Sequence, residues 1–364
     1  MRSGTALIFG AGATKACGGP LTNEILPRAF ELQEFIERED FLVHLDQFLR
    51  ENFHLPQMGA RTRESYPPLP LLIGLVDIAI SRKHSLGPGW GADALLLVRQ
   101  ALDYAIFAVI EHDLLRLVDN YYLNLMRRLP RQAPPTIVSL NYDILADNTL
   151  MRLSEEAGFI GFPDYGCDVA TEIYQQQNKF GKLYKLHGSL NWLYCPSCQR
   201  LDIGTTESGR RTAKMLEVLY MEEETRLDER SGGGDLYRRY TCHGSPCRDC
   251  GTYVTPVMIS PTHLKDYRNP HITRVWYLAE MALRKADRVI IAGYSMPWDD
   301  IDVIYLFKRS LKDLPAAAIT VVEWDPTQRP APEHPVGQNY IKIFGQGLDW
   351  HPEGFADFAL NWQP

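Results

Sequence analysis

Five short apolar segments most constrain what this 364-residue chain can fold into. Each is five residues long, is rich in aliphatic or β-branched side chains, and is followed by a glycine or a polar residue. They are Thr5–Phe9, Thr136–Leu140, Lys182–Leu186, Arg288–Ala292 and Ala318–Val322. Continuous apolar runs of this length are typical of strands in a parallel sheet that helices cover on both faces. The sequence therefore predicts an α/β fold, with the polar residues after the strands at the ligand-binding carboxyl edge of the sheet.

The first segment leads directly into a glycine turn. Gly10-Ala11-Gly12-Ala13-Thr14 follows Phe9. Strand, glycine turn and helix in this order open a nucleotide-binding unit, because small residues let backbone N–H groups approach a pyrophosphate. The third glycine of the dinucleotide-binding motif is absent, since Lys15 stands in its place. A glycine turn with a purely structural role is the alternative.

Apolar periodicity predicts two long helical segments between the first and second strands. Residues 24–55 are amphipathic, and Tyr66–Pro70 (YPPLP) interrupts the helical pattern. From residue 93 to about 128, apolar side chains recur every three or four residues, at positions 102, 106, 110, 114, 117 and 121. This spacing predicts one long helix with a single buried stripe. We therefore expect a helical insertion at about residues 24–130.

Two of the predicted strands are followed by residues that could carry chemistry. Asn141 and Asp143 come directly after Leu140, although an Asx turn or a helix N-cap would explain them as well. His187 follows Leu186 and precedes Gly188. A lone histidine is more often structural, but at the carboxyl end of a strand it could act as a general base near neutral pH.

Candidate ligand-binding residues also follow the last two predicted strands. Gly293 and Ser295 follow Ala292, and the sequence there does not form a hydrolase nucleophile elbow because Pro297 replaces the second glycine. Glu323 follows Val322, where a carboxylate could accept hydrogen bonds from ribose hydroxyls. A solvated strand end is the alternative for Glu323.

Five of the seven cysteines fall between residues 195 and 250. Two C-x-x-C pairs, Cys195/Cys198 and Cys247/Cys250, are separated by 48 residues (247 − 198 − 1). Four thiolates close a tetrahedral zinc site, which gives a structural metal with no open position. Cys242 and His243 are further candidate ligands, and a set of free buried thiols is the alternative. We expect a zinc-binding module at residues 191–256 with a flexible loop through Ser231–Asp235.

Composition excludes several classes of protein. Lys and Arg number 38 against 45 Asp and Glu, so the formal net charge is −7 and the pI is near 5.8. Because gripping a phosphate backbone requires a basic face, direct binding to nucleic acid is not expected. The longest apolar stretch, Leu69–Ile80, already contains Asp77 and is shorter than the ~20 residues of a membrane helix. The N-terminus lacks the features of a cleavable signal, so a cytoplasmic location is expected.

Taken in order along the chain, these features resemble the sirtuin family. The resemblance implies a Rossmann-like NAD-binding domain at residues 1–190 and 257–364, interrupted by the helical insertion and the zinc module. It implies that NAD binds as substrate in the cleft between them. Carried over residue by residue, it assigns phosphate, ribose or other cofactor contacts to Gly10, Ala11, Gly12, Thr14, Pro20, Asn141, Asp143, Gly293, Ser295 and Glu323, and catalysis to Asn141 and His187.

Two departures from protein-deacylating sirtuins point to one branch of the family. Pro20 is followed by Leu-Thr-Asn rather than Asp-Phe-Arg, and Val254–Thr262 replaces the aromatic-glycine-acid segment that pairs with an acyl-lysine peptide. The chain is more similar to the bacterial sirtuin-like proteins of antiphage defence, whose members generally hydrolyse NAD.

The leading hypothesis is therefore an NAD glycohydrolase (NADase) that depletes NAD in defence. Asn141 would position the water or hold the ribose hydroxyls, and His187 would accept a proton. An NAD-dependent lysine deacylase and a non-catalytic NAD or ADP-ribose sensor are the alternatives. Because an enzyme that destroys NAD must be restrained, we expect a homo-oligomer or a regulatory partner protein, with the 24–55 and 93–128 segments as contact surfaces.

Overall fold

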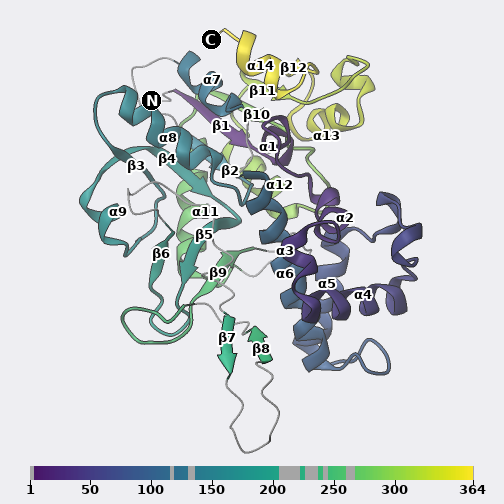
Figure 1. The fold of residues 1–364 in the computed structure, drawn as a ribbon. Helices are drawn as coiled ribbons and strands as arrows, with labels where there is room; N and C mark the ends of the chain where they lie inside the picture. The colour runs from purple at the N-terminus through teal and green to yellow at the C-terminus, as the bar shows by residue number, and fades with distance from the viewer. Residues whose placement is uncertain are drawn as a thin grey trace, which may run out of the picture.

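A seven-stranded parallel sheet forms the centre of the computed structural model (Figure 1). The structure describes residues 4–114, 119–129, 136–204, 222–225, 237–240, 245–259 and 267–363. The strand order is β12-β11-β10-β1-β2-β4-β3, and every neighbouring pair is parallel. The strands are β1 (Thr5–Phe9), β2 (Thr136–Ser139), β3 (Gly161–Asp164), β4 (Asn178–Lys185), β10 (Arg288–Ala292), β11 (Ile319–Val322) and β12 (Asp349–His351).

The predicted α/β class is confirmed, and the five predicted strands are the five central strands of this sheet. The sequence pattern did not indicate β3 and β12, which form the two edges. β3 contains Pro163, which has no N–H to donate to a neighbouring strand. β12 reads Asp-Trp-His and is half-buried, so it lacks the apolar signature of the inner strands.

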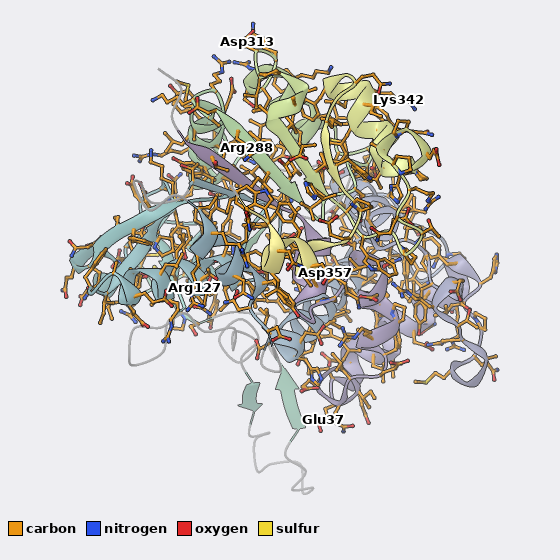
Figure 2. The ribbon with its side chains drawn as sticks, turned by 90° about the horizontal axis from the view of Figure 1, so that it is seen from above. Glu37, Arg127, Arg288, Asp313, Lys342 and Asp357 are labelled. Atoms are coloured by element: carbon orange, nitrogen blue, oxygen red, sulfur yellow. The ribbon has the colours of Figure 1, made fainter. Side chains whose placement is uncertain are left out.

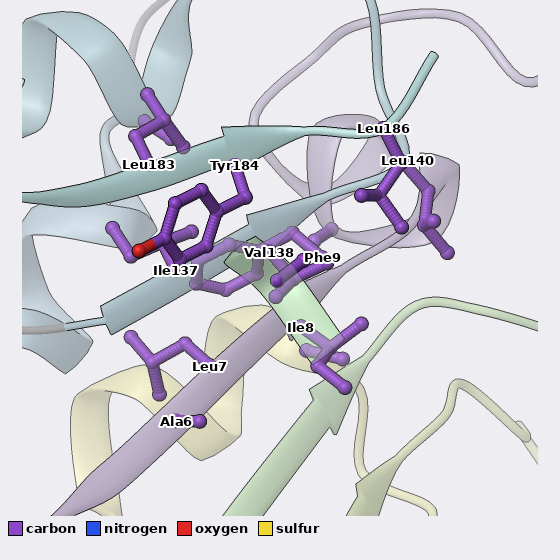
Figure 3. Close-up of a cluster of buried hydrophobic side chains, with 14 of the residues drawn as sticks. Ala6, Leu7, Ile8, Phe9, Ile137, Val138, Leu140, Leu183, Tyr184 and Leu186 are labelled. Atoms are coloured by element: carbon purple, nitrogen blue, oxygen red, sulfur yellow. The ribbon is translucent and has the colours of Figure 1, made fainter. Parts of the chain in front are cut away.

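The core of the sheet is built from the aliphatic side chains that predicted it. Figure 3 shows the side chains of β1, β2 and β4 packed together, among them Leu7, Val138 and Leu183, each with 0% exposure. Because side chains from both faces of these strands are buried, the runs are apolar without alternation.

Helices cover both faces of the sheet in three layers. On one face α14 packs against α1 and α7, and α7 packs against α8. On the other face α11 packs against α12 and β4, and α13 follows β11. Their bounds are α1 (Ala11–Ala16), α7 (Tyr121–Arg128), α8 (Leu145–Glu156), α11 (Pro270–Leu283), α12 (Ile301–Ser310), α13 (Pro335–Phe344) and α14 (Phe355–Asn361).

The helices between α1 and α7 form a separate lobe at one side of the sheet (Figure 1). They are α2 (Ile25–Ala29), α3 (Gln33–Ile36), α4 (Glu39–Phe53), α5 (Leu69–Arg82) and α6 (Ala92–Leu114). Their buried residues form a second hydrophobic core that runs from Ile25 to Ile110 and also takes in Ile144 and Leu190. By this packing the lobe ends before α7, whose Tyr122, Leu125 and Met126 belong to the core of the sheet.

Both long helices predicted from periodicity are interrupted. The 24–55 segment is three helices, because Leu32 and Arg38 have non-helical backbone (ψ 131° and 67°). The 93–128 segment is α6 and α7, and the side chain of Asn120 caps α7 by accepting from the Leu123 N–H at 3.1 Å. An Asn immediately before an apolar-periodic stretch signals the start of a helix, and a prediction from periodicity alone does not use this signal.

The cysteine-containing region forms a small antiparallel sheet next to the parallel one. Its order is β6-β5-β9, with β5 (Gly188–Tyr194), β6 (Leu201–Ile203) and β9 (Thr255–Met258). A two-stranded ribbon, β7 (Glu222–Thr225) and β8 (Tyr237–Tyr240), extends from it. The predicted loop Ser231–Asp235 and the spare ligands Cys242 and His243 lie outside the described residues.

The remaining elements are short. They are α9 (Glu172–Gln176) and the 3-10 helices Thr22–Glu24, Met58–Ala60, Arg63–Ser65, Ala316–Ala318 and Ala331–Glu333. Charged side chains such as Glu37 and Asp313 lie at opposite ends of the molecule, exposed to solvent (Figure 2). Among the helices that the structure describes, none combines the length and apolarity needed to cross a membrane.

Candidate functional site

A cavity of about 320 Å³ opens at the carboxyl ends of the central strands. From β1 the chain continues to β2 on one side, and it later returns to β10 on the other side of β1. This reversal of strand order is a topological switch point, where ligands bind in open α/β sheets. Nine of the residues predicted from the sequence line the cavity: Gly10, Ala11, Thr14, Pro20, Asn141, Asp143, His187, Gly293 and Ser295. Gly12 and Glu323 are not part of the lining.

The two glycine turns at the switch point pack directly against each other. The Gly12 N–H donates to the Gly293 carbonyl at 2.8 Å, and the Gly10 N–H donates to the Ala292 carbonyl at 3.0 Å. Gly293 has φ +64°, and a Cβ there would lie 2.1 Å from the Ala13 nitrogen. Only glycine fits this contact. The structure thus gives Gly12 a packing role, because its N–H is already bonded.

Asn141 is held from inside by the glycine turn. Its Nδ2 donates to the Gly10 carbonyl and to Thr14 Oγ1, both at 2.9 Å, and approaches the Tyr122 hydroxyl at 3.4 Å. Since the amide nitrogen is committed, the amide oxygen is the atom that Asn141 can offer to a ligand. Tyr122, buried beside Thr14 and Asn141, was not predicted because its role depends on the packing of α7.

Asp143 is a buried carboxylate behind Asn141. Its Oδ2 accepts from the Thr14 hydroxyl at 2.5 Å, and its Oδ1 accepts from the Leu145 N–H at 2.9 Å at the start of α8. Burial raises the pKa of Asp143, against the opposing effects of Lys185 and the Thr14 hydrogen bond. The side chain therefore links the glycine turn to the loop after β2.

His187 lies in the short turn between β4 and β5, directly before Gly188. Its Nδ1 lies 3.1 Å from the Leu140 carbonyl. Because that carbonyl only accepts, Nδ1 carries the proton and Nε2 carries the lone pair of the neutral ring. Gly188 has φ +82°, and a Cβ there would lie 1.9 Å from the Val257 carbonyl oxygen. The His-Gly pair thus places an imidazole base beside β9, in the same cavity as Asn141.

Another part of the cavity wall comes from the helical lobe. Ile25, Leu69, Ile106 and Ile110 line it from α2, α5 and α6. These residues are apolar core residues in the sequence, and no local signal distinguishes them from the rest of the second core. An apolar wall lowers the local dielectric and restricts water.

Two aspartates also line the cavity. Asp299 and Asp300 line it from the loop after β10. The Tyr294 hydroxyl donates to Asp300 Oδ2 at 2.8 Å, and burial together with Asp300 raises the pKa of Tyr294. Tyr294 is therefore a neutral hydrogen-bond donor.

Glu323 lies further along the sheet edge. It follows β11, and its Oε1 accepts from the N–H of the exposed Trp324 at 3.0 Å. Burial raises the pKa of Glu323. The structure places it one strand beyond β10, outside the cavity that contains Asn141 and His187.

The four predicted cysteine ligands come together. Their Sγ atoms all lie within 4.8 Å of one another, with 3.4 Å between Cys195 and Cys250 and 3.6 Å between Cys198 and Cys247. Sulfurs about 2.3 Å from a tetrahedral zinc ion are about 3.8 Å apart, whereas a disulfide is about 2.05 Å long. The cluster fits a four-thiolate structural zinc site.

Both C-x-x-C turns use the same backbone hydrogen bonds. The Cys195 N–H donates to the Arg200 carbonyl and the Cys247 N–H to the Thr252 carbonyl, each at 2.8 Å. Arg200 then joins the two turns, because its Nη1 donates to both carboxylate oxygens of Asp249 at 3.0 Å. The module is therefore preorganised for the metal by elements from both ends of the insertion.

Comparison with known proteins gives a likeness in fold only. No protein-family model matches the sequence, and no curated protein matches it. Among solved structures, the chain is similar to a mutant Sir2 homologue in complex with 2′-O-acetyl ADP-ribose (13% identity, 98% of this chain and 88% of that chain, TM-score 0.43). It is also similar to a Sir2 homologue–NAD complex (13%, 98% and 86%, 0.42) and to Sir2Tm bound to a propionylated peptide (13%, 99% and 91%, 0.35). At identities of 13% and TM-scores below 0.5, this likeness does not assign the chain to a family.

Proposed function

We propose that the chain is an NAD glycohydrolase that cleaves the nicotinamide–ribose bond of NAD to give nicotinamide and ADP-ribose. The observation that carries the proposal is the convergence of Asn141 and His187, from two adjacent strands, in one cavity at the switch point of the sheet. Asn141 offers an acceptor oxygen there, and His187 offers a base. This is the pair of groups that orientation of a sugar and activation of a water require.

Cleavage of the nicotinamide–ribose bond accounts for the other features of the cavity. Cleavage passes through an oxocarbenium-like centre at the ribose carbon, so the site must orient the ribose and admit a single water. We assign to Asn141 Oδ1 the binding of the ribose and the water. We assign to His187 Nε2 the acceptance of the proton that the water loses. The apolar wall from Ile106 and Ile110 supports this assignment, because it limits access of other water to the reacting carbon.

We place the pyrophosphate at the two glycine turns. Gly10, Ala11, Gly293 and Ser295 line the cavity there, with no side chain larger than a hydroxymethyl group among them. Small residues let a phosphate approach the backbone closely. With a net charge of −7, the chain has no general positive field to gather a dianionic substrate, so local donors must supply this binding.

A lysine deacylase would use the same pair of residues, with the acyl oxygen as nucleophile. Its peptide would have to pair with the segment after the zinc module. In this chain the Ile259 N–H donates to the His187 carbonyl at 2.8 Å, and the Ile259 carbonyl accepts from the Tyr142 hydroxyl. Both backbone groups of Ile259 are therefore already bonded, which favours hydrolysis over peptide binding.

The proposed setting is antiphage defence by NAD depletion, with the activity restrained by a homo-oligomer or a regulatory partner protein. This part of the proposal rests on the sequence resemblance. A fully active monomer in gel filtration combined with a turnover assay would contradict the restraint.

Nicotinamide release from NAD by the purified protein tests the reaction. Asn141→Ala and His187→Ala should each abolish release while the protein stays folded. Release that requires an acylated peptide would assign the deacylase, and tight ADP-ribose binding without turnover would assign a sensor. Unchanged release from both variants would refute the catalytic pair.

A further inference from the structure

A buried ion pair lies directly beneath the Asn141–Asp143 loop. Lys185 and Asp147 both have fully buried side chains (0% exposure), and Lys185 Nζ lies 3.1 Å from Asp147 Oδ2. The same ammonium donates to the backbone carbonyl of Asp143. Asp147 also accepts a hydrogen bond from the Tyr165 hydroxyl.

The position of this ammonium is unusual for a structural lysine. Buried ion pairs contribute little net stability compared with well-packed apolar residues, because both charges lose their hydration. Lys185 is two residues before His187 on β4, and Asp147 is in the first turn of α8, four residues after Asp143. The pair therefore connects β4, which leads to His187, with α8, which follows the Asn141–Asp143 loop.

From this arrangement we infer that Lys185 is a positioning residue for the reaction. Its ammonium donates a hydrogen bond to the Asp143 carbonyl and so fixes the position of the Asn141–Asp143 loop relative to His187. Asp147 holds the ammonium in place, and the Tyr165 hydroxyl in turn donates to Asp147. This inference rests on the proposed function, since the loop is positioned for the ribose that Asn141 binds.

A single substitution of Lys185 would not separate a role in stability from a role in positioning the loop. Lys185→Met alone leaves Asp147 as an uncompensated buried charge, so loss of activity could follow from misfolding. The triple variant Lys185→Met/Asp147→Leu/Tyr165→Phe removes both charges and the phenol together and refills their space with apolar groups. It preserves the packing but leaves the Asp143 carbonyl without its ammonium donor.

We expect the triple variant to unfold at a temperature close to that of the wild type. Its kcat for nicotinamide release should fall at least tenfold with KM changed less than threefold, because orientation at the reacting carbon is lost while remote binding is kept. Amide hydrogen exchange of the peptide that spans residues 139–148 should rise. Lys182→Met, at an exposed lysine of the same strand, is the matched control and should change neither kcat nor the exchange of residues 139–148.

The readouts also distinguish this inference from the proposed function. If the wild type releases no nicotinamide, even as a dissociated monomer free of any restraining partner, the proposed function fails, and the exchange of residues 139–148 still decides the positioning role. A folded triple variant with wild-type kcat and unchanged exchange would overturn the inference. A triple variant that fails to fold would overturn it as well, since Lys185 would then be required for stability.

Discussion

Gly293→Ala should damage both stability and activity, because two turns meet at this residue. The backbone at Gly293 is left-handed, and the added Cβ would lie 2.1 Å from the Ala13 nitrogen and 2.4 Å from the Gly12 carbonyl carbon. Both are backbone atoms, which cannot move aside as a side chain could. The two turns must therefore separate by about 1 Å or more, since ordinary contacts begin near 3.5 Å.

The cost can be worked from the contacts. A left-handed alanine costs about 1–2 kcal/mol, overpacking about 1–3 kcal/mol, and the loss of the bond from the Gly12 N–H to the Gly293 carbonyl about 1–3 kcal/mol. Because these terms overlap, we expect about 3–6 kcal/mol in all. With an unfolding entropy of about 2 cal/mol/K per residue, this lowers Tm by about 4–8 °C for a chain of this length. Moving the turn by about 1 Å should also lower turnover about 100-fold.

Gly158→Ala is the matched control. Gly158 has φ +89°, and nothing lies within 4 Å of an added Cβ, so only the conformational cost of about 1–2 kcal/mol applies. Scanning calorimetry and nicotinamide release on both variants give the comparison. Equal effects of the two substitutions on Tm and on turnover would refute the close contact at the switch point.

Three further predictions concern other parts of the molecule. Metal analysis should find about one zinc per chain, and Cys198→Ser or a strong chelator should lower the unfolding temperature, because such sites contribute folding free energy. Burial raises the pKa of Asp143 above the 3.8 of the unfolded chain, so the folded state binds a proton more tightly and loses stability as the pH rises from 3.8 through the raised pKa. The stability of Asp143→Asn relative to the wild type should therefore increase between pH 3 and pH 7 in a pH series of melts, while nicotinamide release falls. Burial raises the pKa of the Cys167 thiol to about 12, so this cysteine should resist an aromatic disulfide reagent at pH 8 until the protein is unfolded, and rapid labelling in the native protein would contradict its burial.

The inner part of the fold could be predicted because it follows from local composition. A strand such as Arg288–Ala292 has apolar side chains on both faces because both faces are buried in the structure. The edge strands could not, since Asp349–His351 is half-buried and pairs on one side only. Helix interruptions at Leu32 and Arg38 likewise depend on tertiary packing, which overrides the amphipathic pattern across them.

The candidate site was predictable where its residues follow strands, and not where they come from elsewhere. Asn141 and His187 lie at strand ends, so their meeting follows from the parallel sheet. Ile106 reaches the same region from a helix of the lobe and Tyr122 from α7, and no sequence spacing specifies the orientation of either helix. Lys185 was counted only as part of an apolar strand, because its buried charge becomes visible only beside Asp147.

The polar residues around the cavity show why the sheet can hold such a site at all. Thr14, Asn141 and Asp143 are buried, and each is bonded to another of them or to the backbone. Such a network, fully satisfied, fixes one arrangement of its members, whereas water would allow many. Ionisation of Asp143 nevertheless opposes folding, since burial raises its pKa. The apolar strands beneath must offset that cost, and a residue that weakens folding in a well-packed core is the kind expected where geometry serves a reaction.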